Sequence, residues 1–332
     1  MHPVVERSRR IADEVLFPEA IATDAAASVP TPLLDALADA GLYGIAGPSH
    51  AGGLDLDVAT TNAVIEALAS GCLSTTFVWI QHHSGVRAVA RSSTAGLRER
   101  WLPPMCRGEV RGGIARAGEI PGPPRLTAHA EGDGLVLDGE APWVTGWGRI
   151  DVLLVAARRG PDVVRMLVDA RPAGTIHAER LPLVGTNASG TFTLSFRGHP
   201  VAADRIVETL PFAEVAANDP STLRTNGSLA LGVAARCCAL LGAGPLDDAL
   251  EEVRAALDDA TPASLPAARA RASELAVRAA AALIVEQGGR AIVMDHHAQR
   301  LAREALFLLV FGSRSSIRDE LLQLLVRAPV AG

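Results

Sequence analysis

Two pairs of adjacent histidines are the first residues in this sequence that could do chemistry. The pairs are His82-His83 and His296-His297. A histidine titrates near neutral pH and can act as a general base. Neighbouring residues on a helix point about 100° apart, so only one member of a pair can face a given pocket. A helix cap, surface or loop position is the plainer interpretation, and no i, i+4 histidine or nearby carboxylate predicts a metal site.

Residues that are missing exclude several other kinds of chemistry. All 31 basic residues are arginine, so the sequence contains no lysine. That excludes Schiff-base chemistry with pyridoxal phosphate and a Walker A phosphate loop, since both need a lysine. The four cysteines are scattered without metal-ligand spacing. Residues 242–248 contain glycines but follow a helical pattern rather than a strand, so they fail the test for a dinucleotide-binding fingerprint.

Length and composition predict a large globular protein. The chain has 332 residues, 48% of them hydrophobic, which is enough for two or three lobes or one large domain. The net charge of −6 gives no basic footprint for nucleic acid. No stretch resembles a signal peptide or reaches the roughly 20 apolar residues of a membrane span. We therefore expect a cytoplasmic protein that binds neither nucleic acid nor a membrane.

Hydrophobic periodicity divides the chain into three sections that must position any site. Residues 1–112 show helical spacing, and residues 208–332 form alanine-rich helical patterns typical of a bundle. Residues 113–207 alternate apolar and polar side chains between Gly, Asp and Pro, which predicts a small antiparallel barrel or sandwich. Within the last section, a helical pattern stops at Gly312 and restarts, as a glycine helix terminus does.

Four segments, in this order, resemble the acyl-CoA dehydrogenase family of flavoproteins. In the last segment, the family's Gly-Gly pair and Glu-Arg-x-x-Arg-Asp-Ala motif match the glycine pair and both arginines, Arg300 and Arg303. Each motif alone is weak, but four of them around a strand block make a fairly specific signal. The segments are residues 37–57, 98–115, 135–158 and 288–305.

The resemblance implies an α+β fold and a bound flavin adenine dinucleotide (FAD). The fold would have an N-terminal helical domain (residues 1–112), a central antiparallel β-barrel (113–207) and a shortened C-terminal helical bundle (208–332). FAD would lie between the barrel and the bundle.

Four residues match the family's flavin contacts. Trp143 and Thr145 match the Trp-x-Thr that packs on and hydrogen-bonds the isoalloxazine, and an indole and a hydroxyl suit those tasks. Gly288 and Gly289 match the pair beside the pyrophosphate–adenosine half. A buried core tryptophan and a helix C-cap are the structural alternatives.

The general base of the family has no counterpart at its usual position. The family's reaction removes the α proton of an acyl thioester with a carboxylate while a hydride leaves the β carbon. In register, Gly312 occupies that position, with Arg314 two residues further on. The other position used by the family, on the first helix after the barrel, offers Asn226 and Ser228 but no carboxylate. Neither position therefore identifies a catalytic residue. Loss of a general base lowers the rate of such a reaction by ~10²–10⁴-fold.

Two further segments depart from the family pattern. Residues 115–125 replace a Thr-Glu-Pro … Gly-Ser-Asp segment that binds flavin and substrate. The Arg-x-Gln-Phe-Gly loop, which reaches the adenine half of FAD across a subunit interface, is missing.

Four hypotheses follow. The first is an FAD-dependent oxidoreductase of acyl-CoA or a related acyl thioester, as in fatty acid metabolism, with a relocated base and a homo-oligomeric assembly. The second is a non-catalytic subunit in a hetero-oligomer with a catalytic acyl-CoA dehydrogenase. The third is a flavin monooxygenase-like member, and the fourth is a flavin-free helical interaction module. In the first, His82, His83 and Arg314 are expected at the substrate pocket.

Overall fold

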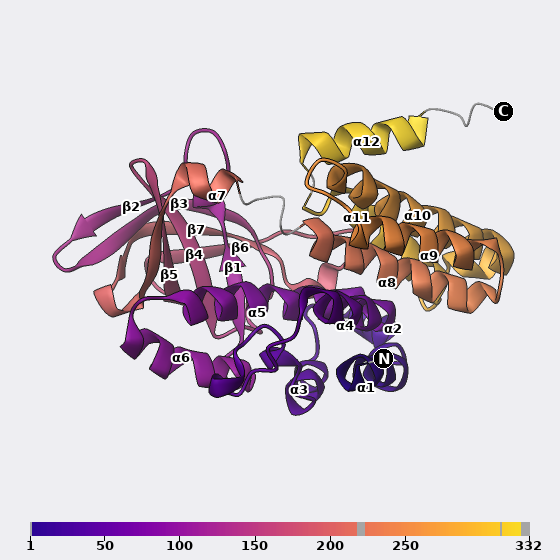
Figure 1. The fold of residues 1–332 in the computed structure, drawn as a ribbon, viewed down its shortest axis with the longest axis horizontal. Coiled ribbons are helices and arrows are strands. Elements are labelled where there is room, and N and C mark those ends of the chain that lie inside the picture. The colour runs from indigo at the N-terminus through magenta and orange to yellow at the C-terminus, as the bar shows by residue number, and fades with distance from the viewer. Residues whose placement is uncertain (1, 218–222, 313, 327–332) are drawn as a thin grey trace.

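Helices at both ends of the chain flank one β-sheet in the computed structural model, which describes residues 2–217, 223–312 and 314–326 (Figure 1). The N-terminal helices are α1 (Pro3–Ile11), α2 (Ala20–Ala25), α3 (Thr31–Asp39), α4 (Val58–Gly71), α5 (Leu73–Arg91) and α6 (Ala95–Cys106). The C-terminal helices are α7 (Phe212–Ala217), α8 (Leu223–Leu241), α9 (Pro245–Asp258), α10 (Leu265–Gln287), α11 (His297–Val310) and α12 (Ser315–Val326). None of these helices is both long enough and apolar enough to span a bilayer.

The strands form a single mixed sheet with the order β6-β7-β3-β2-β4-β5-β8. The first strand, β1, lies off this path and pairs in parallel with β4. The strands are β1 (Gly112–Ala115), β2 (Leu126–Glu131), β3 (Gly134–Val144), β4 (Val152–Arg159), β5 (Asp162–Asp169), β6 (Ile176–Arg180), β7 (Phe192–Val201) and β8 (Ile206–Pro211).

The predicted antiparallel β-barrel is therefore wrong in two respects. The sheet is open, because the end strands β6 and β8 do not pair with each other. It is also mixed, because β4 pairs in parallel with β1 and, at Thr127 and Arg158, with β2. Alternation of apolar and polar residues identifies a strand but carries no information about its direction or its partner. The helix–sheet–helix order was predicted correctly.

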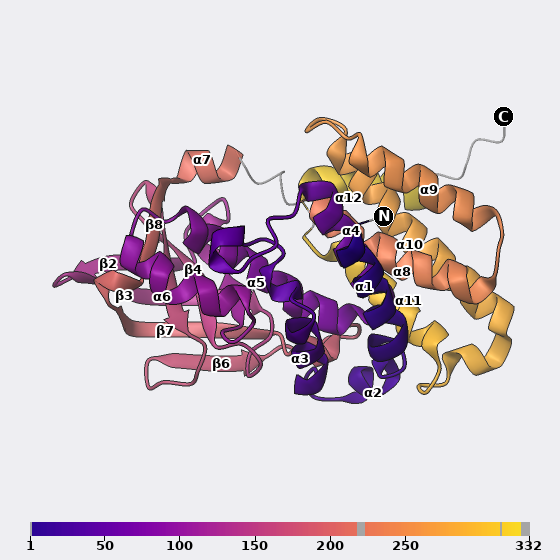
Figure 2. The same cartoon turned by 60° about the horizontal axis from the view of Figure 1, so that its bottom comes forward.

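The helices and the sheet have separate hydrophobic cores. The N-terminal helices and the C-terminal bundle share one core, in which Leu68 of α4 and Leu229 of α8 are fully buried. The sheet has its own core, which includes Leu137 and Val155. Figures 1 and 2 show the sheet and the bundle at opposite ends of the molecule, with α5 beside the sheet and α4 beside the bundle.

A third cluster and one helix cap fix the helices that border the junction. Val86 of α5 and Met105 of α6 pack with Leu154 of β4. Asp57 caps the N-terminus of α4, and its carboxylate accepts a hydrogen bond from the backbone N–H of Thr60 at 2.6 Å. Such a cap fixes the first turn of a helix. The polar residues of α4 and α5 therefore face the junction on rigid supports.

The two arginines of the C-terminal motif lie in the scaffold. Arg300 donates to the carboxylate of Glu304 at 2.6 Å, and both side chains are almost completely buried. Arg303 forms an ion pair with Asp24 of α2 and so ties α11 to the N-terminal helices. These contacts give the motif a structural role within the described residues.

Candidate active site

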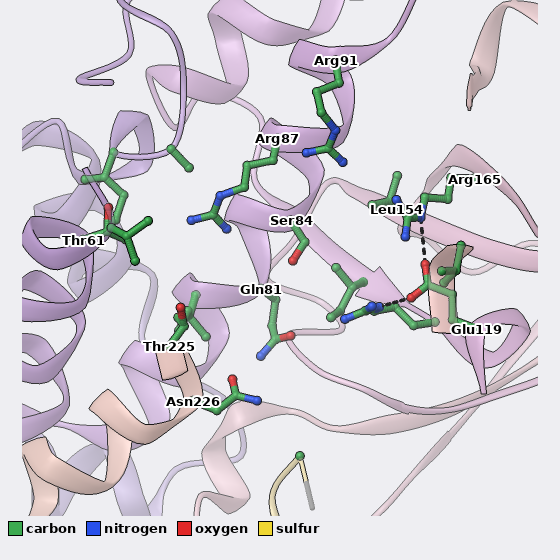
Figure 3. Close-up of a pocket in the computed structure, with 18 of the residues that line it drawn as sticks. Thr61, Gln81, Ser84, Arg87, Arg91, Glu119, Leu154, Arg165, Thr225 and Asn226 are labelled. Atoms are coloured by element: carbon green, nitrogen blue, oxygen red, sulfur yellow. Dashed lines mark hydrogen bonds and ion pairs between the residues drawn. The ribbon is translucent and has the colours of Figure 1, made fainter. Parts of the chain in front are cut away.

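A pocket of about 760 Å³ opens where α4, α5, the sheet, α8 and the turn after α11 meet (Figure 3). One face of α5 forms its longest wall. The α5 residues that line it are spaced as on a single face of a helix. They are Ile80, Gln81, Ser84, Arg87 and Arg91.

The Phe311–Gly312 turn closes one end of the pocket, and its shape depends on glycine. Gly312 has φ +62°, a left-handed conformation that L-residues with a Cβ adopt at a cost. A Cβ at position 312 would lie 2.7 Å from Nδ2 of Asn226 on α8. The amide of Asn226 therefore occupies the space into which a side chain at 312 would project.

A buried arginine holds this turn from behind. Nη2 of Arg269 donates to the carbonyl oxygens of Leu308 at 3.3 Å and Phe311 at 3.4 Å, and Ser273 Oγ donates to the same Leu308 carbonyl at 2.8 Å. These bonds satisfy carbonyls that the end of α11 leaves free. Burial lowers the pKa of Arg269 to about 10, so the guanidinium stays charged at neutral pH.

An ionic cluster forms the sheet side of the pocket. Glu119 accepts hydrogen bonds from Arg116 and, at 2.8 Å, from Arg165. Arg165 also donates to Glu208 at 2.7 Å, and Arg91 lies 3.7 Å from the same carboxylate. Burial lowers the pKa of Arg165, but the two carboxylates outweigh burial and leave it raised. Both carboxylates are therefore engaged by arginines.

Neutral hydrogen-bonding groups from α4, α5 and α8 line another part of the pocket, which Asp55 and Glu214 also border. Asn62 is 3% exposed, and its Oδ1 has no hydrogen-bond partner among the described residues. Gln81 donates to the carbonyl of Phe77 at 3.0 Å. Thr61, Ser84 and Thr225 add hydroxyls. This part of the pocket suits a polar, uncharged portion of a ligand.

Trp143 and Thr145 lie beside the pocket wall but do not line the pocket. The register of β3 against β7 shifts between Ala141 and Val144, and Trp143 in this bulge has φ +62° and a 62% exposed side chain. Thr145 is buried, with its hydroxyl 3.2 Å from that of Thr191. A bulge redirects a side chain out of a strand, which excludes the core-tryptophan alternative.

The end of β3 lies next to the strand that reaches the pocket. A Cβ at Gly113 would be 3.4 Å from the carbonyl oxygen of Thr145, and the next residue of β1, Ile114, lines the pocket. The exposed indole of Trp143 suits a flat heterocycle placed against this wall, whereas the Thr145 hydroxyl is buried beside Thr191. Of the two residues, Trp143 is the one whose exposed side chain fits the ring system of a flavin.

The other sequence-predicted residues divide between the pocket and its surroundings. Arg314 and Gly312 line the pocket. Gly288 and Gly289 lie at the C-terminal end of α10 with exposed backbone and open space where side chains would be, and they are not part of the pocket.

His82 and His83 point away from the pocket, into the scaffold. Gly112 N donates to Nδ1 of His82 at 2.9 Å, so its Nε2 donates to the carbonyl of Met105, 3.1 Å away. Burial lowers the pKa of His82 to about 3, and burial also lowers that of His83 well below its usual value. The α5 face that lines the pocket presents Gln81 and Ser84 instead.

Sequence reasoning missed most of the charged lining. Arg87 and Arg91 share the helical spacing of Gln81 and Ser84, and that pattern was available in the sequence. Arg116, Glu119 and Arg165 come from separate elements, which no local pattern brings together.

Comparison with known proteins identifies relatives of both the sequence and the fold. Residues 3–109 match the sequence model "Acyl-CoA dehydrogenase, N-terminal domain". The short-chain specific acyl-CoA dehydrogenase of Bos taurus mitochondria is 26% identical over 209 residues, which is 60% of this chain and 51% of that protein. The benzylmalonyl-CoA dehydrogenase of Aromatoleum aromaticum is 28% identical over 57% of this chain and 52% of that protein. This chain thus spans about half the length of these relatives.

Solved structures extend the likeness of the fold to nearly the whole chain. Butyryl-CoA dehydrogenase from Megasphaera elsdenii superposes with a TM-score of 0.81 at 16% identity, over 98% of this chain and 99% of that chain. A chain from the structure of the electron transferring flavoprotein of Acidaminococcus fermentans has a TM-score of 0.83 at 18% identity, over 98% and 97% of the two chains. At these identities the structures establish the fold alone.

Proposed function

Because the chain belongs to the acyl-CoA dehydrogenase family, we propose that it is an FAD-dependent oxidoreductase acting on an acyl thioester. The observation that carries the proposal is the pocket between β1, α5 and the Phe311–Gly312 turn, with the exposed Trp143 and the Thr145 hydroxyl beside its wall. Bound FAD would supply an acceptor for a hydride.

The residues of this chain would bind and shield the reactants. Trp143 would cover one face of the flavin ring, while Gly288 and Gly289 leave room for the adenosine half. The aromatic rings of Phe77, Phe307 and Phe311 pack within 5.4 Å of one another and would keep water from the closed end of the pocket.

Proton removal is the step for which this pocket offers least. Gly312 carries no base, and Asn226 beside it is an amide that donates or accepts hydrogen bonds but does not take a proton. Glu119 and Glu208 are bound by arginines, and two further carboxylates, Asp55 and Glu214, line the pocket away from the Gly312 position in the sequence. We therefore assign Asn226 a binding role toward the thioester and leave the base unassigned.

The visible spectrum of the full chain tests this proposal. The chain is incubated with excess FAD, freed of unbound FAD by gel filtration, and then mixed with butyryl-CoA without oxygen. We expect retained flavin bands, and bleaching on addition of the thioester. Trp143→Ala should weaken flavin retention, whereas Trp101→Ala on α6 should not. A wild-type chain that retains no flavin would contradict the proposal.

A second candidate is a non-catalytic subunit paired with a catalytic acyl-CoA dehydrogenase. Two observations favour it: the pocket lacks a base at Gly312, and apolar side chains are exposed on the C-terminal bundle. The exposed residues include Val285, Ile292, Met294, Leu306 and Val310. Flavin bands that appear only after coexpression with a neighbouring dehydrogenase gene would support this candidate, and reduction of the isolated chain by an acyl-CoA would exclude it.

The simplest repair of the missing base needs two substitutions. Gly312→Glu alone places a Cβ against Asn226 and forces a left-handed backbone on glutamate. Gly312→Glu together with Asn226→Gly removes the contact. If a missing base limits the reaction, the double variant should oxidise butyryl-CoA faster than Asn226→Gly alone, by up to ~10²-fold.

A further inference from the structure

One arginine in the pocket has no carboxylate to neutralise it. Arg91, Arg116 and Arg165 each contact Glu119 or Glu208. Arg87, one turn before Arg91 on α5, forms neither a hydrogen bond nor an ion pair with any described residue. Figure 3 shows its guanidinium projecting from the helix into the open space of the pocket.

Arg87 is exposed to solvent in the pocket, and its surroundings favour an anionic ligand. Partial burial and the like charge of Arg91, one turn further along α5, lower the pKa of Arg87. A guanidinium nevertheless keeps its proton in proteins, so the positive charge remains. An anion that enters the pocket would offset both effects. Arginine is suited to this task because its planar fork binds carboxylate and phosphate oxygens in pairs.

The geometry of α5 places Arg87 far from the closed end of the pocket. Phe77 packs edge-on against Phe311 with ring centroids 4.8 Å apart, which fixes where α5 meets the Gly312 turn. Arg87 follows Phe77 by ten residues, and this corresponds to about 15 Å along a helix. The neutral groups of Gln81 and Ser84 lie between the two. A ligand that fills the pocket would therefore be polar and uncharged in its middle and anionic toward Arg87.

We propose that Arg87 recognises an anionic group of the thioester ligand, a carboxylate or a phosphate. This inference rests on the proposed function only in taking a thioester as the ligand. Two parts of such a ligand carry the required chemistry: the free carboxylate of a dicarboxylic acyl group, and the phosphates of the carrier. Arg87 is thus a specificity-determining residue, and the two sources of the anion differ in what its removal changes.

Binding measured by calorimetry separates the two sources. The probes are butyryl-CoA, glutaryl-CoA and the N-acetylcysteamine thioesters of butyrate and glutarate, which contain no phosphate. Each is titrated into the full chain with FAD present, as wild type and as Arg87→Gln. Arg278→Gln is the control, because this arginine on α10 pairs with Glu274 outside the pocket. Hydrogen bonds between charged groups correspond to roughly 10–100-fold in affinity.

Each outcome bears on the proposal. If Arg87→Gln loses affinity for both glutaryl thioesters and for neither butyryl thioester, the anion is the carboxylate of the acyl group. If Arg87→Gln loses affinity equally for both CoA thioesters and not for the N-acetylcysteamine thioesters, the anion is a phosphate of the carrier. The proposal is overturned if the affinity of Arg87→Gln stays within about twofold of wild type for every probe. It is also overturned if Arg278→Gln loses as much affinity as Arg87→Gln. So does a wild type that binds none of the four.

Two further measurements keep the result interpretable. Arg87→Lys retains the charge and should keep most of the affinity, so a deficit confined to Arg87→Gln reports charge rather than misfolding. Binding is measured without turnover. A chain that binds the probes through Arg87 but never reduces flavin would therefore overturn the proposed function and leave this inference standing.

Discussion

Two arginine–glutamate pairs in this molecule have the same chemistry in very different surroundings. Arg300 and Glu304 lie inside the C-terminal bundle, with side chains 1% and 2% exposed. Arg91 and Glu208 lie at the pocket, 3.7 Å apart, with the arginine 57% exposed. Charges inside a protein lose their hydration, whereas the exposed Arg91 keeps most of its own, beside a Glu208 side chain that is 16% exposed. The first pair should therefore matter for folding, and the second should be free to serve a ligand.

The largest loss in the free energy of unfolding is expected from breaking the buried pair, Arg300 and Glu304. Glu304→Gln leaves the charge of Arg300 inside the bundle, where Nε of Arg300 already lacks a partner among the described residues. Removing one member of a buried pair costs about 3–5 kcal/mol. Urea unfolding should show a loss of that size. The double variant Arg300→Met/Glu304→Leu should recover most of it, and a loss below about 1 kcal/mol in Glu304→Gln would contradict the assigned difference between the pairs.

The same contrast explains how much of the molecule could be predicted from its sequence. Helical and alternating periodicities are local, so the helix–sheet–helix order could be predicted. The pairing of β1 with β4 could not, because the parallel partner lies about forty residues away and alternation does not encode direction.

Resemblance located the scaffold better than the pocket. It marked Arg300 and Arg303, which are structural, and it marked Gly312, which lines the pocket. It gave no indication of the ionic cluster around Arg165 on the sheet side of the pocket. Nor did it indicate that the amide of Asn226 lies where a side chain at position 312 would project. Both depend on contacts between distant elements, and no local sequence pattern records such contacts.

Acid should destabilise the scaffold through His82, the next largest effect. Its folded pKa of about 3 is below the usual value of 6.5, so the unfolded chain binds the proton first as the pH falls. Stability from this residue is complete above pH ~6.5 and is lost progressively toward pH ~3. At pH 5 the loss is about 2 kcal/mol.

Urea unfolding at pH 7 and pH 5 measures this loss. His82→Gln should reduce the difference between the two pH values by about 2 kcal/mol. His177→Gln on the exposed edge strand β6 serves as the control and should leave the difference unchanged. An equal pH dependence in wild type and His82→Gln would mean that this histidine is not held neutral inside the scaffold.

The Gly312 turn should show an intermediate effect, since it belongs to both regions. Gly312→Ala forces alanine into a left-handed conformation, at about 1–2 kcal/mol, and adds the contact with Asn226. Gly312→Ala/Asn226→Ala should lose only the conformational part relative to Asn226→Ala. If the penalty is the same in both backgrounds, Asn226 does not press on this turn. Urea unfolding of the four proteins completes the cycle.

The smallest effect is expected at the open pair. In Arg91→Gln, Glu208 still accepts from Arg165 at 2.7 Å, so no buried charge is left without a partner. The loss in unfolding free energy should be at most about 0.5–1 kcal/mol and should shrink further in high salt, because water and ions screen exposed charges. Arg165→Gln should cost more, since it strips both Glu119 and Glu208 of a partner. If Arg91→Gln instead approached the cost of Glu304→Gln, the pocket would be as rigidly paired as the bundle, and its arginines would have little freedom to turn toward an incoming anion.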